Sequence, residues 1–295
     1  MTRSHGGRSR GRNRPGVGRR DRFAGPRAAV ARGESLVGTV IEVEVGSVAH
    51  GGFCVARHEG RVVFVRHTMP GERVRARVTE GGTENRFLRA DAVEILTAAA
   101  ERVDPRCRHA GPGGCGGCDW QHVSLPAQRE LKAAVVEEQL RRLAGLERPV
   151  RVEALPGDDS GFHWRTRMEF AVGPDGRAGL RPHRSHAVLP ITECPIAHPD
   201  LLTTDVLGQD WTGERALDVV VADSGTVVVP VPSGGSGPEI TQLVAADRWS
   251  GELRLAARGF WQVHPSAAAA LVDRVLGGLA AQRGERVLDL YAGVG

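Results

Sequence analysis

Three cysteines within twelve residues constrain this chain more than any other feature of its sequence. Cys107, Cys115 and Cys118 follow the spacing C-x7-C-x2-C in a loop rich in glycine, and Cys194 lies in a distant segment. A C-x2-C pair can direct two sulfurs at one centre, and the intervening glycines let backbone amides approach those sulfurs. With Cys194 as a fourth ligand, the pattern predicts a metal centre that suits a [4Fe–4S] cluster.

Zinc is an equal alternative on spacing alone, because it also takes four sulfurs, or three sulfurs with a histidine such as His109 or His122. A disulfide framework is disfavoured, since the five cysteines are unevenly spaced in a chain without a signal-peptide pattern. The fifth, Cys54, falls in a β-branched run, where a free cysteine packs as a small hydrophobic residue. We therefore expect a cytoplasmic protein.

The positive charge of the chain is concentrated at its N-terminus. Residues 1–33 hold ten arginines and a single acidic residue, Asp21, so the rest of the chain is net acidic. This segment is rich in Gly, Arg and Ser without apolar periodicity, so we expect a disordered tail. It would contact RNA phosphates, serve only as a solubilising extension or, less in keeping with the rest, act as a transit peptide.

Residues 34–97 predict a small β domain. Apolar residues alternate from Leu36 onward, and short β-branched runs are separated by Gly and Pro. About five short strands in some sixty residues favour a closed barrel of the OB type, because closure removes exposed strand edges.

Residues 98–245 predict a central domain of mixed α/β structure that begins with the cysteine loop. A helix is expected from Pro126 to about Leu143, where apolar residues recur at helical spacing. A second β-rich stretch follows, and no run of about 18 apolar residues suggests a membrane span. The fold class is therefore α+β with several domains.

Residues 246–295 predict the start of a doubly wound α/β domain. A helix is expected with Pro265 near its first position, continuing to about Leu279. A buried strand over 285–290 and a glycine turn complete the pattern.

Four arginines are candidate RNA contacts. Arg57 and Arg66 fall in the expected barrel, whose face often binds single-stranded nucleic acid, and Arg165 and Arg167 flank a later strand. Solvated surface positions are the alternative for all four.

The segment 287–295 reads as a strand followed by a glycine turn. Such a turn brings the backbone close to a nucleotide-like ligand. A lone G-x-G is a weak signal. The acidic residue Asp289, four positions before Gly293, fits the sheets of methyltransferases that use S-adenosyl-L-methionine (SAM) better than NAD-binding sheets.

Taken together, residues 35–295 resemble the RNA 5-methyluridine methyltransferases, the TrmA/RumA-like family. The segment GFCVARHEGRVVFVRHTMPGERV resembles a TRAM domain, and HWRTRMEF resembles a central segment that faces RNA. The four loop cysteines resemble the [4Fe–4S] ligands of the family, which favours iron–sulfur over zinc. Their first gap is seven residues instead of about five, a change that a loop tolerates.

The resemblance also implies a SAM site. Gln262 matches the SAM-binding glutamine of an F-x-Q-x-N segment, with His264 in place of the asparagine. The other implied SAM-binding residues are Asp289, Tyr291, Gly293 and Gly295.

The activity implied is transfer of a methyl group to carbon 5 of a uridine in RNA, ribosomal RNA rather than transfer RNA, by a monomer. A cysteine thiolate adds to carbon 6 and a base later removes the carbon 5 proton. In the family both groups lie beyond the SAM turn, and neither Cys54 nor Cys194 has a matching context. We therefore expect a C-terminally truncated, inactive fragment.

Three other functions fit parts of the sequence. A non-catalytic RNA-binding module with a metal knuckle is the main alternative. A radical-SAM methylthiotransferase would need C-x3-C-x2-C ahead of the barrel, so both the spacing and the order disfavour it. A Rossmann oxidoreductase has only the G-x-G in its favour.

Overall fold

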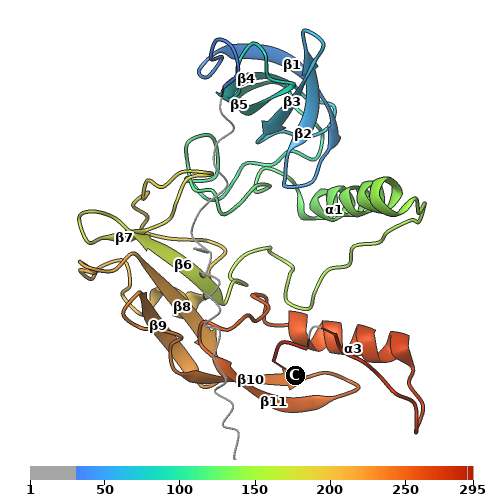
Figure 1. Cartoon of the computed structure of the whole chain (residues 1–295), viewed down its shortest axis with the longest axis vertical. Coiled ribbons are helices and arrows are strands. Elements are labelled where there is room, and N and C mark those ends of the chain that lie inside the picture. Colours follow the sequence, from blue (N-terminus) through green and yellow to red (C-terminus); the bar gives the residue numbers. More distant parts are fainter. Residues whose placement is uncertain (1–30, 291, 295) are drawn as a thin grey trace, which may run out of the picture.

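The computed structural model describes residues 31–290 and 292–294 (Figure 1). The expected disordered tail lies almost wholly outside the described residues, and so do Tyr291 and Gly295. Figure 1 shows a β-barrel at one end of the molecule and a pair of packed sheets at the other, with the long helices α1 and α3 between them.

The N-terminal domain is a closed five-stranded barrel, which confirms the expected OB-like architecture. Its strands are β1 (Val40–Val48), β2 (Cys54–His58), β3 (Arg61–Arg66), β4 (Arg73–Glu80) and β5 (Phe87–Thr97). They close in the order β1-β2-β3-β5-β4. Every second residue of β4 is buried, so alternation along the strands separates the barrel core from solvent.

The surroundings of Cys54 and the start of the first strand can be compared with the predictions. Cys54 is fully buried among valines such as Val63 and Val65, so its expected place in the core is confirmed. The first strand begins at Val40 instead of Leu36, because Gly38 has a φ of +93° and interrupts the extended backbone.

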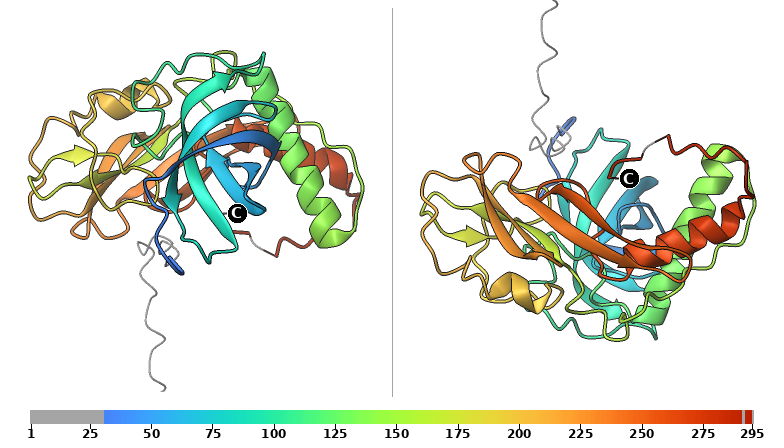
Figure 2. Two further views of the ribbon diagram at one scale, coloured as in Figure 1. Left: turned by 90° about the horizontal axis from the view of Figure 1, so that it is seen from above. Right: turned by 90° about the horizontal axis from the view of Figure 1, so that it is seen from below.

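The expected helix after the cysteine loop is present as α1 (Leu125–Gln139), which continues into the π-helical turn η1 (Leu140–Ala144). Pro126 occupies its first turn, where no helical N–H is lost. Leu131 and Val135 pack against the barrel core. Figure 2 shows α1 lying alongside the barrel.

The central domain is built on an antiparallel sheet. Its strands are β6 (Arg167–Val172), β7 (Ala178–Gly179), β8 (Ala216–Ala222) and β9 (Gly225–Val231), in the order β7-β6-β8-β9. One face packs on the short helix α2 (Pro199–Leu202) through Phe170, Leu201 and Leu217. The other face packs on a hairpin of β10 (Glu239–Ala245) and β11 (Ser250–Ala256).

The last part of the chain departs from the prediction. The expected helix is present as α3 (Ala267–Leu279) and ends at Leu279 as predicted, but it begins after Ser266, so Pro265 precedes the helix. The expected buried strand over 285–290 is wrong: these residues are irregular and exposed, with Leu288 at 82% and Leu290 at 80% exposure. A buried strand needs neighbouring strands on both sides, and none is described beside this segment.

Residues 150–155, at the start of the β-rich stretch expected after the first helix, are irregular as well. They belong to the extended connection that leads from α1 to the central sheet (Figure 1). In the described part of the chain, no helix is both long and apolar enough to cross a membrane.

Candidate metal centre and nucleic-acid interface

The fold brings together the four cysteines that the sequence singled out. Cys107, Cys115 and Cys118 lie on the loop between the barrel and α1, and Cys194 lies on the loop before α2. Every pair among these four thiols is close enough for an electrostatic interaction. Among residues 31–290 and 292–294, however, no group of three or more metal-ligating side chains already has coordination geometry.

Backbone contacts hold the cysteine loop against the segment 181–183 of the central domain. Cys115 forms an isolated β-bridge with Pro182, and the Gly116 amide donates to the Arg181 carbonyl at 2.9 Å. A Cβ on Gly116 would lie 2.7 Å from the backbone nitrogen of His183. This close approach therefore requires glycine at position 116.

Burial and nearby hydrogen-bond donors act in opposite directions on the pKa of these thiols, and burial prevails. Burial raises the pKa of the Cys118 thiol to about 11, and it also raises the pKa of Cys115 and of Cys194. Hydrogen bonds oppose this rise. The Gly117 amide lies 3.3 Å from Cys115 Sγ, the Ile196 and Ala197 amides approach Cys194, and a Gln121 side-chain bond reaches Cys118.

Such donors commonly surround the sulfurs of iron–sulfur clusters, where they tune the bound thiolates. Four converging thiols with amide donors are the kind of side chains that a tetrathiolate metal group requires.

The cysteine loop is also joined to the barrel. Arg66 Nη2 lies 2.9 Å from Asp119 Oδ1, and the Trp120 indole donates to the Gly52 carbonyl at 3.3 Å. The Arg66 side chain is only 6% exposed. Arg66, expected to contact RNA, thus points into the junction between barrel and cysteine loop.

The other candidate RNA contacts differ in accessibility. Arg57 is exposed on β2. Arg165 donates to the carbonyl of Arg167, and Arg167 Nη1 donates to the carbonyls of Ala257 and Gly259 at 3.1 and 2.6 Å. Arg167 therefore fastens the end of β11 to the central sheet.

A group of aromatic side chains on the barrel was not predicted from the sequence. The Arg89 guanidinium lies 5.9 Å from the ring centre of Phe53 and 5.1 Å from that of Phe87. Phe64 makes edge-to-face contacts with both rings. Aromatic residues beside arginines on barrel strands are a signal for stacking surfaces in nucleic-acid binding, and these are present in the sequence.

The expected SAM residues are only partly brought together. Gln262 is exposed and borders a cavity of about 630 Å³ beside α3. Within the described part of the SAM turn, Asp289 and Gly293 lie outside the lining of this cavity. His264 accepts a hydrogen bond from the Ser266 amide through Nδ1 at 3.2 Å, and its ring stacks on Trp164.

A comparison with protein families matches residues 34–93 to the TRAM domain. Two relatives, each described as an uncharacterized RNA methyltransferase, come from Streptomyces coelicolor and Streptomyces avermitilis. They are 46% and 44% identical to this chain over 88% of its length. A 23S rRNA (uracil(1939)-C(5))-methyltransferase of Shewanella piezotolerans is 30% identical over 86% of this chain. The chain spans about two thirds of the length of these relatives, at 65%, 68% and 66%.

Proposed function

This chain belongs to the TrmA/RumA-like family of RNA methyltransferases, and we propose that it serves in the SAM-dependent methylation of carbon 5 of a uridine in RNA. The proposal rests on one combination of observations. The chain has a TRAM barrel, and most of its length is similar to proteins that are described as RNA methyltransferases. Ribosomal RNA is the proposed substrate, because the Shewanella relative is described as an enzyme of 23S rRNA.

We further propose that the four loop cysteines hold a [4Fe–4S] cluster. Such a cluster would supply a rigid covalent link between loops that are far apart in sequence. Two contacts connect the cysteine loop to its neighbours. Asp119 pairs with Arg66 of the barrel, and the Gly116 amide donates to a backbone carbonyl of the central domain. The proposed role is therefore to set the angle between the barrel and the central domain, both of which would contact RNA.

Gln262 is the residue proposed to bind SAM, because its side chain is exposed at the edge of a cavity large enough for part of that molecule. Asp289 and Gly293 are proposed to contribute from the SAM turn, in a different arrangement from the one described. Tyr291 and Gly295 would act there too. The SAM sulfonium would supply the methyl group.

The reaction needs a thiolate that adds to carbon 6 and a base that takes the carbon 5 proton. All five cysteines are described, and none is placed for this step. Cys54 is enclosed in the barrel, where burial and then Glu72 raise the pKa of its thiol to about 12, and the other four converge on one another. We therefore propose that residues 1–295 alone do not catalyse methyl transfer to RNA.

Deleting the gene from its host and digesting the RNA to nucleosides tests the proposed activity. We expect mass spectrometry to show loss of 5-methyluridine from one site of ribosomal RNA, restored by the intact gene. Unchanged 5-methyluridine in both ribosomal and transfer RNA would refute the proposal, and loss from transfer RNA alone would correct the substrate.

A further inference from the structure

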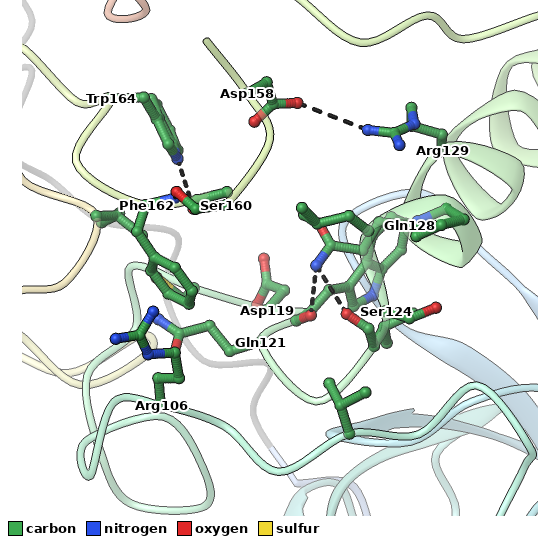
Figure 3. Close-up of a pocket in the computed structure, with 18 of the residues that line it drawn as sticks. Arg106, Asp119, Gln121, Ser124, Gln128, Arg129, Asp158, Ser160, Phe162 and Trp164 are labelled. Atoms are coloured by element: carbon green, nitrogen blue, oxygen red, sulfur yellow. Dashed lines mark hydrogen bonds and ion pairs between the residues drawn. The ribbon is translucent and has the colours of Figure 1, made fainter.

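A second cavity, of about 910 Å³, lies between the cysteine loop, the first half of α1 and the segment 154–164 (Figure 3). Gln121 of the loop, Ser124 and Gln128 at the start of α1, and Phe162 and Trp164 of the segment surround its open centre. Cys118, one of the four proposed cluster ligands, also lines this cavity, whereas Gln262 does not.

Aromatic rings form one wall of this cavity. The Arg106 guanidinium lies 4.8 Å from the ring centre of Phe162. The Trp164 indole donates to the Gly161 carbonyl at 3.1 Å, which fixes the orientation of its ring. Trp164 also stacks on His264, with ring centres 6.1 Å apart and planes 23° apart. His264 does not line the cavity, so this stack of rings ends at the cavity wall.

The charges around the cavity favour a neutral guest. Three cations, Arg106, Arg129 and Lys132, line it together with four carboxylates, Asp104, Asp119, Asp158 and Asp159. The excess of carboxylates would repel a phosphate group placed in the cavity. A flat uncharged heteroaromatic ring would not be repelled. A ring that continues an aromatic stack beside an arginine face is what a nucleic-acid base provides.

The position of the cavity fits an RNA that reaches the SAM-binding side of the molecule. Pro156 and Thr166, near the two ends of the same segment, line the cavity that Gln262 borders. The segment thus borders both cavities, and a base bound in the first would lie beside the segment that also borders the proposed SAM site.

We infer that the cavity beside Phe162 and Trp164 binds one unpaired base of the RNA substrate, a neighbour of the target uridine. The inference rests on the proposed function, since it assumes that RNA is the substrate. It adds a base-binding subsite formed by the segment 154–164 and the cysteine loop, with Arg106 at its rim.

Binding of a fluorescein-labelled single-stranded RNA of ten nucleotides to the anaerobically purified chain tests the inference. Loss of one stacking surface costs about 1–3 kcal/mol, so we expect Phe162→Leu to weaken binding about tenfold. Arg106→Gln, which changes an exposed side chain and spares the fold, should weaken binding in the same direction. Trp249→Leu, at the β10–β11 turn outside the cavity, is the matched control and should bind normally.

Photo-crosslinking of the same RNA carrying 5-iodouridine locates the base directly. We expect a crosslinked peptide that contains Phe162 or Trp164 and that is lost in Phe162→Leu. Crosslinks confined to other peptides, or Phe162→Leu and Arg106→Gln variants that bind as tightly as the original chain, would overturn the inference while leaving RNA binding intact. Failure of the original chain to bind RNA would overturn the proposed function as well.

Discussion

The guanidinium of Arg66, at the end of β3, lies 2.9 Å from the carboxylate of Asp119, the residue that directly follows Cys118. The two residues are separated by 53 positions in the chain. This ion pair directly connects the barrel to the loop that carries three of the four converging cysteines. The position of the barrel therefore depends on whether that loop is ordered.

Asp119→Ala should destabilise this junction, because it leaves a buried guanidinium without its carboxylate. We expect the free energy of unfolding to fall by about 2 kcal/mol, and hydrogen exchange to rise at the turn that contains Gly52. Asp119→Asn, which keeps a hydrogen-bond acceptor, should cost less. Asp104→Ala is the control on an exposed acid; equal losses in Asp104→Ala and Asp119→Ala would contradict the proposed link.

Gly116→Ala should displace the cysteine loop from the segment 181–183 of the central domain. Its new methyl group would lie 2.7 Å from the backbone nitrogen of His183, so the backbone must move. We expect the purified variant to retain less than half of the metal bound by the original chain. Gly278→Ala in α3, where an added Cβ meets no atom within 4 Å, should retain all of it. Equal metal contents would show that the bridge does not position Cys115.

The environment of Glu72 indicates that the folded protein loses stability in acid. Burial acts to raise the pKa of its carboxyl, but hydrogen bonds from Arg102, Met69 and Ala99 outweigh burial and lower it below the ordinary value of 4.5. The stabilisation is therefore present above pH 4.5 and is lost as pH falls through the lower folded-state pKa. Glu72→Gln should cost about 3 kcal/mol at pH 7 in urea unfolding. A variant as stable as the original would contradict the role of this carboxylate.

The environment of His67 indicates that the stability of the protein also depends on pH under milder conditions. Burial first, and then the nearby Arg66, His122, His183 and Arg102, lower the pKa of His67 from 6.5 to about 3. Between these values the unfolded chain takes up a proton that the folded chain does not, so stability falls as pH decreases, by at most about 1.4 kcal/mol per pH unit.

His67→Asn removes that titration. His67 has a φ of +62°, a conformation that asparagine tolerates better than most residues, so the backbone should be preserved. Urea midpoints measured at pH 7 and pH 5 should differ less in the variant than in the original chain. An unchanged pH dependence would exclude His67 as its source.

The sequence predicted best those features that depend on local pattern. Alternation in β4 and the Gly and Pro breaks between strands were enough to predict a five-stranded barrel, and the burial of Cys54 followed from its β-branched neighbours. The convergence of Cys194 with the loop cysteines was expected from the cysteine pattern, and the resemblance then favoured iron–sulfur over zinc.

Features that depend on distant partners were not predictable in this way. Arg66 was expected at an RNA surface, but its orientation is set by Asp119, 53 residues away. Arg167 likewise finds its acceptors at Ala257 and Gly259. The segment 285–290 contains Val287, Leu288 and Leu290 and was expected to be a buried strand, but a strand forms only when neighbours supply its hydrogen bonds.

The central claim, that four converging thiols hold a [4Fe–4S] cluster, is tested most directly by iron, sulfide and zinc analysis with an absorption spectrum after anaerobic purification. We predict about four iron and four sulfide per chain and broad visible absorption, all lost in Cys194→Ser and retained in the core control Cys54→Ser. Zinc without iron, or a full iron content in Cys194→Ser, would contradict the account.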